Sequence, residues 1–208
     1  SMALWGTVFG ALFGAYPTNQ LGRKKTLTWV GILFLISALG SALAIHPYIF
    51  SFFRFIGGLA VGVSSITAPI YISEISSPKN RGSLGALYQF SLVFGIMIAF
   101  LSNYLFTGFS GSHDWRWMLG IESVPALFYL IFTLNIPDTP RWQILFQKND
   151  NAALKTLKLI YGENHDLEKL VDDIKSADSP LQKQKYLIRK TKFRTIMLAF
   201  LISFFNQL

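Results

Sequence analysis

The sequence has no cysteine, and charged residues are missing from four long stretches. The absence of cysteine excludes disulfide bonds and thiolate metal sites. The stretches without Asp, Glu, Lys or Arg are residues 1–22, 26–53, 55–73 and 82–113. Runs of this length that are largely apolar are candidate membrane helices, whereas a soluble domain would scatter its charges. The pattern therefore predicts an all-α, polytopic membrane protein.

The sequence also lacks the residue patterns of catalytic, metal and nucleotide sites. Its three histidines, His46, His113 and His165, fall in separate predicted loops and have no ligand spacing. The glycines of R-F-I-G-G-L-A-V-G (residues 54–62) lie in the middle of a predicted span, where a nucleotide could not reach them. A secretory signal pattern is missing as well. We therefore expect no enzyme activity, no cofactor and no metal.

Positive charge is abundant but confined to alternate loops. The net charge is +8, and of the 19 Lys and Arg residues only Arg54 and Arg116 fall outside residues 23–25, 79–81 and 141–194. Such a bias follows the positive-inside rule, which places these loops on the cytoplasmic side of the membrane. The membrane is expected to be a plasma membrane or a bacterial inner membrane. The bias argues against a nucleic-acid partner.

The apolar runs predict the order of the membrane helices. They are expected at about 3–19, 26–44, 48–72, 82–106 and 116–135, and a last one begins near residue 195. Both ends of the chain lie inside apolar runs, so we expect a fragment. The predicted layout has transmembrane helices in 1–136, a cytoplasmic helical linker in 137–191 and the start of another transmembrane helix in 192–208.

Within the linker, two short amphipathic helices are predicted. Asp150 and Asp166 stand at their N-cap positions, and Gly162 would end the first helix. In the second helix the apolar residues share one face; they are Leu167, Leu170, Val171 and Ile174.

Glycines at every fourth position predict close packing between membrane helices. Gly6, Gly10 and Gly14 share one face of the first helix, and Gly58 and Gly62 share one face of a later helix. Small residues at this spacing allow two helix backbones to approach closely. We assign these glycines no chemistry.

Two opposite charges occur inside predicted membrane helices. Arg54 follows Pro47 by seven residues, and Glu122 follows Trp115 by seven, so both lie about 10 Å from the outer face. Buried charges at one depth are expected to pair. Burial favours the neutral form of Glu122, and Arg54 favours its ionised form. A static structural pair and a proton-coupling pair both fit this pattern.

Further polar residues gather near the inner face. Glu74, Lys79 and Arg81 fall in a short predicted turn, and Arg23 can face the helix ends at Glu74 and Arg81. Gln89 is a lone amide in an apolar run. For any one of these residues a buried ion pair or helix packing is the better explanation, whereas the ordered set favours a functional site. Lys24 and Lys25 are interpreted as topology anchors.

The order of these motifs resembles a known family. G-R-K-K, R-x-x-x-G-x-x-x-G, P-x-Y-x-x-E, R-G, a single Gln and P-D-T-P-R-W follow one another between residues 22 and 142. This series is similar to the sugar porter family of the major facilitator superfamily. Y-P-T-N-Q-L-G-R (residues 16–23) is most similar to its bacterial D-xylose–proton symporters. The resemblance implies a fragment that runs from the second transmembrane helix to the start of the seventh.

The resemblance implies roles for particular residues. Gln89, Asn206 and Gln207 match amides that hydrogen-bond sugar hydroxyls, and Arg54 and Glu122 match residues of proton coupling. An inner-face charge network that latches the outward-facing state would comprise Arg23, Glu74, Arg81, Asp138 and Arg141. Asn19 departs from a common Asp, Asn206 from a common Gln and Asp138 from a common Glu.

The expected function is secondary active transport of a monosaccharide, a hexose or a pentose, by proton symport with alternating access. The alternatives are a facilitative sugar uniporter, a non-transporting sugar receptor and a fragment with no function alone. A receptor should carry long cytoplasmic extensions, and the insert here is short. The expected partners are the monosaccharide, a proton, the lipid bilayer and the missing remainder of the chain.

Overall fold

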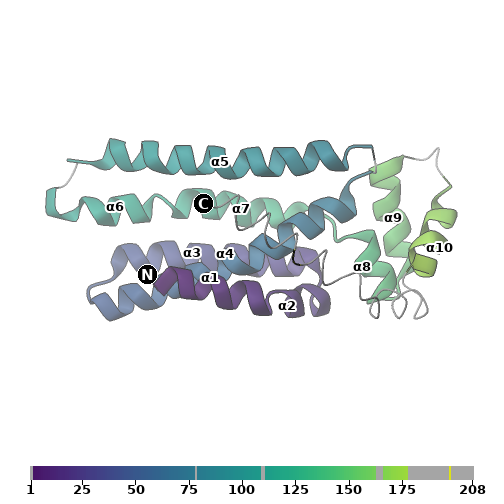
Figure 1. Ribbon diagram of the computed structural model, residues 1–208, viewed down its shortest axis with the longest axis horizontal. Helices are drawn as coiled ribbons and strands as arrows, with labels where there is room; N and C mark the ends of the chain where they lie inside the picture. The colour runs from purple at the N-terminus through teal and green to yellow at the C-terminus, as the bar shows by residue number, and fades with distance from the viewer. Residues whose placement is uncertain (1, 78, 109–110, 163–165, 178–196, 198–208) are drawn as a thin grey trace. The chain divides into compact units, whose positions relative to one another are not determined.

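The computed structural model describes residues 2–77, 79–108, 111–162, 166–177 and 197. The regular elements of these residues are all helices (Figure 1), which confirms the predicted all-α class. The chain divides into two compact units, residues 1–167 and 168–208.

The described helices agree with the predicted membrane spans. Four segments are long and apolar enough to cross a membrane; they are α3 (Arg23–Leu43), α4 (Pro47–Ile75), α5 (Arg81–Phe106) and the segment Asp114–Asn135. The last consists of α6 (Asp114–Gly120) and α7 (Ser123–Asn135), and the 3-10 turn η1 (Gly111–His113) precedes it. At the start of the chain, α1 (Met2–Phe13) is apolar but shorter, and α2 (Ala15–Gln20) follows.

Two of the predicted spans are not continuous helices. The first is interrupted at Gly14, and the fifth at residues 121–122, where Glu122 directly precedes α7. In both cases a proline follows, Pro17 or Pro125. Proline has no N–H for the carbonyl four residues earlier and its ring crowds that carbonyl. The residue four before Pro17 is Phe13, and the first interruption follows it at Gly14. The residue four before Pro125 is Ile121, where the second interruption begins. The prolines thus explain where both interruptions lie.

Glycines bring α1 and α4 into close contact, as their spacing predicts. A Cβ atom at Gly6 would overlap the backbone carbonyl of Phe55, and one at Gly58 would overlap that of Ala3. The same holds for Gly62 against α1. Only glycine allows two helix backbones to approach this closely.

The helix α5 is the least covered of the long helices. None of its residues is buried. It contacts α4 and α6, and Figure 1 shows it running parallel to α6. Its apolar surface therefore remains open to lipid or to protein outside this unit.

Two short helices lie at one end of the bundle (Figure 1), α8 (Pro140–Leu145) and α9 (Asp150–Tyr161). The Thr156 hydroxyl on α9 donates to the side-chain oxygen of Gln143 on α8, at 3.2 Å. Asn149, and not the predicted Asp150, is the N-cap of α9, since its side chain accepts from the Ala152 N–H at 3.1 Å. Asn149 is equally suited to capping, so the prediction was wrong by one residue. Gly162 ends α9 with a positive φ of 78°, as predicted.

The helix α10 (Leu167–Ala177) shows the predicted amphipathic pattern. Its polar residues are exposed, and the less exposed side chains are Leu167, Leu170, Val171 and Ile174. The predicted transmembrane start in 192–208 lies outside the described residues, apart from Met197.

Candidate functional site

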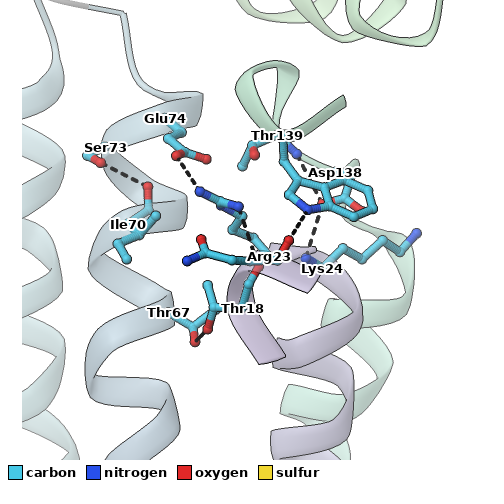
Figure 2. A network of polar contacts seen from close by, with 11 residues as sticks. Thr18, Arg23, Lys24, Thr67, Ile70, Ser73, Glu74, Asp138 and Thr139 are labelled. Carbon is cyan, nitrogen blue, oxygen red and sulfur yellow. Dashed lines mark hydrogen bonds and ion pairs between the residues drawn. The ribbon is translucent and has the colours of Figure 1, made fainter. Parts of the chain in front are cut away.

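The charges predicted to lie at the inner face centre on a buried ion pair. Arg23 opens α3, and its Nη2 lies 2.9 Å from Oε1 of Glu74 in the last turn of α4 (Figure 2). The two side chains are only 7% and 9% exposed. Glu74 thus belongs to the helix and not to the predicted turn. Breaking such a pair leaves an uncompensated buried charge, so the contact ties the start of α3 to the end of α4.

Hydroxyl and carbonyl groups surround this pair. The guanidinium of Arg23 also reaches the backbone carbonyl of Thr18, at 3.4 Å. The Thr18 hydroxyl lies 2.7 Å from that of Thr67 on α4, and both side chains are buried. Figure 2 shows these residues of α2, α3 and α4 converging on Arg23. The network therefore joins three helices at one end of the bundle.

Asp138 extends the network from the segment after α7. Its Oδ1 accepts from the backbone N–H groups of Lys24 and Thr139, each at 3.3 Å. Burial raises the pKa of the Asp138 carboxyl; the two backbone hydrogen bonds and the charges of Arg23 and Lys24 act against this rise. The hydrogen bonds and the nearby positive charges therefore offset only part of the cost of burying the Asp138 carboxylate.

A tryptophan docks α8 onto the turn before α3. The indole N–H of Trp142 donates to the backbone carbonyl of Asn19 at 2.8 Å, and the side chain is 4% exposed. The ring packs against Gly22, whose φ is 92° and where a Cβ would lie 3.0 Å from ring atoms. Positive φ and this close approach both require glycine. Since only the Asn19 carbonyl is used, the departure from Asp at this position leaves the contact intact.

The structure does not bring every predicted inner residue into this network. Arg81 at the start of α5 and Arg141 on α8 are exposed, and their side chains form no ion pair among the described residues. One Glu74 oxygen, Oε2, and the Nε of Arg23 are buried without a hydrogen-bond partner in the described part of the chain. The pair thus has unused hydrogen-bonding capacity.

Arg54 and Glu122 form the predicted ion pair between α4 and the start of α7. Arg54 Nη1 lies 3.6 Å from Glu122 Oε2, and the side chains are 30% and 52% exposed. A cavity of about 400 Å³ adjoins the pair and is lined also by Thr7, Ser37 and Tyr129. A carboxyl group that is accessible from a cavity can exchange a proton with water that enters it, while the neighbouring guanidinium stays charged.

Of the predicted sugar-binding amides, the structure describes only Gln89. Gln89 is exposed on α5 and does not line the cavity beside Arg54. Asn206 and Gln207 lie outside the described residues. In the described part of the chain, no group of His, Asp and Glu residues could hold a metal ion.

Sequence reasoning missed the contacts that use backbone atoms. These are the Trp142 bond to Asn19, the Lys24 N–H bond to Asp138 and the Tyr71 hydroxyl bond to the Pro137 carbonyl at 3.0 Å. The available signal was Gly22, since a glycine directly before a helix often allows close approach of another group.

A family model described as sugar (and other) transporter matches residues 1–208. A glucose transport protein of Synechocystis sp. is 37% identical over 197 residues, which cover 89% of this chain and 41% of that protein. A galactose-proton symporter of Escherichia coli is 43% identical over 142 residues, 68% of this chain and 30% of that protein.

Solved structures resemble the chain as well. A partially occluded, inward-open structure of the xylose transporter XylE from E. coli matches with a TM-score of 0.78 and 31% identity. The match covers 85% of this chain and 46% of XylE. The chain thus spans less than half the length of these relatives. The predicted resemblance, the multi-pass membrane location and the major facilitator fold are confirmed.

Proposed function

Because the chain belongs to the sugar (and other) transporter family, we propose that it forms part of a transporter that carries a monosaccharide together with a proton. The observation that carries this proposal is the ion pair of Arg54 and Glu122 beside a cavity within membrane-spanning segments. Relatives named as a galactose-proton symporter and an arabinose-proton symporter support it.

The coupling step is a proton exchange on Glu122. The Arg54 guanidinium stays charged, so only the carboxyl of the pair titrates. A shift of α4 against α7 changes the distance between the two charges and with it the proton affinity of Glu122. Because Glu122 directly precedes α7, at the interruption before Pro125, the carboxyl lies where the segment has lost part of its helical hydrogen bonding. Proton uptake and helix movement are thereby linked.

The sugar is held by amides. Gln89, Asn206 and Gln207 are the proposed ligands, since amides both donate to and accept from hydroxyl groups. Amides also cost less to bury than charges. The exposure of Gln89 on α5 is consistent with a ligand that binds between this bundle and protein outside it. The substrate is a hexose or a pentose.

The inner network is the proposed latch for alternating access. In this structure Arg23 pairs with Glu74, and Asp138 accepts from the backbone N–H of Lys24, the residue after Arg23. Arg81 and Arg141, which are exposed, would join it when the opposite half of the transporter approaches. Rocking of two halves about a midplane site is the general mode of such folds.

The proposed layout follows from these roles. Residues 1–136 supply transmembrane helices, 137–191 a cytoplasmic linker and 192–208 the start of the next transmembrane helix. The partners are a lipid bilayer of the plasma or bacterial inner membrane and the rest of the transporter. We expect no enzymatic turnover and no bound cofactor.

A binding experiment tests the sugar site. In the complete transporter, Gln89→Ala should weaken monosaccharide affinity by about fivefold to tenfold, the loss of one hydrogen bond. Asn103→Ala is the matched control, since Asn103 is another exposed amide on α5. Counterflow exchange in proteoliposomes measures both variants. Equal affinity of Gln89→Ala and parent, at normal membrane levels, would remove Gln89 from the site.

A further inference from the structure

A row of contacts between aromatic rings and guanidinium groups joins the outer ends of α4 and α6 to the Arg54–Glu122 pair. The guanidinium carbon of Arg116 lies 5.0 Å from the centre of the Trp115 ring. The Trp115 ring meets the Phe50 ring edge-on, with 6.0 Å between centroids and an angle of 87°. The guanidinium of Arg54 in turn lies 5.7 Å from the Phe50 ring. We call Arg116, Trp115, Phe50 and Arg54 the outer stack.

The outer stack is fixed at its far end to a third helix. Arg116 Nη2 donates to the backbone carbonyl of Ala44 at 3.1 Å, and Ala44 is the C-cap of α3. A cation at a helix C-terminus interacts favourably with the helix dipole. Arg116 is one of the two basic residues that the charge bias of the loops does not explain, and this contact gives it a place in the fold.

The contact with Phe50 restricts where the Arg54 side chain can go. Phe50 lies one helical turn before Arg54, a spacing at which side chains on a helix meet. A guanidinium over an aromatic ring is attracted by the ring electrons. Trp115 closes over Phe50 from α6, so the ring that carries Arg54 is itself held in place. Without these rings, the long Arg54 side chain would have more rotamers away from Glu122.

We propose that Phe50 and Trp115 are positioning residues that hold Arg54 against Glu122 and so set the pH range of proton uptake at this pair. The inference rests on the proposed proton-coupled function. The groups around Glu122 support it. Arg54 of α4 and Tyr129 of α7 are the titratable or charged side chains that line the adjoining cavity, in addition to Glu122, and α1 and α3 contribute the hydroxyls of Thr7 and Ser37. Arg54 is therefore the cation whose position matters most to Glu122 in the described part of the chain.

The test measures the pH dependence of proton-driven uptake in the complete transporter. Phe50→Leu and Trp115→Leu keep apolar volume and remove the ring. In both, the midpoint should move to higher pH by about half a unit, a roughly threefold change in proton affinity, because a carboxyl group holds its proton more tightly when its cation is free to leave. Trp115→Phe keeps a ring and should retain the parent midpoint. Sugar exchange without a proton gradient should stay unchanged.

Phe52→Leu is the matched control, since Phe52 lies on the same helix, is 60% exposed and contacts Phe53 and not the outer stack. A midpoint does not depend on the amount of protein in the membrane, so reduced insertion of a variant does not obscure the result. Parent midpoints in both leucine variants would overturn the positioning role and leave symport intact. A parent protein whose uptake shows no proton dependence would overturn the proposed symport, and this inference with it.

Discussion

At the scale of single residues, Asp138 shows how burial and hydrogen bonding oppose each other. Burial favours its neutral form, while the N–H groups of Lys24 and Thr139 and nearby positive charge favour the carboxylate. The net effect is a raised pKa. The Asp138 carboxyl therefore binds a proton more tightly in the folded protein than in the unfolded chain, where the pKa of an Asp is about 3.9.

This difference predicts a pH dependence of stability. The contribution of Asp138 is fully present below the unfolded pKa and is lost as pH rises from about 4 through the raised folded pKa. Asp138→Asn imitates the neutral form and still accepts a hydrogen bond, so it should remove this part of the pH dependence. Thermal unfolding in detergent between pH 4 and 7 measures the effect. Identical slopes in parent and variant would show that Asp138 does not titrate differently on folding.

At the scale of elements, Gly22 decides how α8 is attached to the bundle. Gly22→Ala places a methyl group against the Trp142 ring and forces an L-residue to a φ of 92°. With ψ at 162°, this is a backbone region that almost only glycine adopts, and another residue there costs about 1–3 kcal/mol. We expect at least this loss of stability by thermal unfolding, together with increased hydrogen exchange in α8.

Gly82→Ala provides the opposite case on α5. A Cβ there meets nothing within 4 Å, and Gly82 lies in the first turn of a helix. Alanine in a helix is favoured over glycine by up to about 1 kcal/mol, so this variant should be neutral or stabilised. If Gly22→Ala were equally well tolerated, the docking of Trp142 would be looser than the structure shows.

The sequence predicted the contacts that depend on residue spacing along a helix, but not those made by backbone atoms. Spacing along a helix fixes depth, which is why Arg54 and Glu122 could be paired, and the glycine period fixed the contact of α1 with α4. Spacing does not fix which of several nearby cations an acid meets, and Glu74 meets Arg23 and not Arg81. Contacts that use backbone carbonyls, such as that of Asn19 with Trp142, leave little trace in residue types.

At the scale of the whole molecule, the inner network should control which side of the membrane is open. Glu74→Gln leaves the Arg23 charge buried and weakens the proposed latch, which should favour the inward-open state. Single cysteine reporters on each face, in a sequence with no native cysteine, measure this by thiol labelling. Lys25→Gln is the control, because Lys25 is exposed. Equal labelling in Glu74→Gln and parent would leave Glu74 a structural residue only.

Proton-driven accumulation of a monosaccharide by Glu122→Gln tests the central claim most directly. Glutamine imitates the protonated carboxyl and keeps its size, so the helices can still rock, but no proton can be released. In proteoliposomes with an inward proton gradient, the parent should concentrate the sugar and Glu122→Gln should only equilibrate it. Exchange without a gradient should proceed in both. Uphill accumulation by Glu122→Gln at the parent level would contradict the account and make the Arg54–Glu122 pair a static link between α4 and α7.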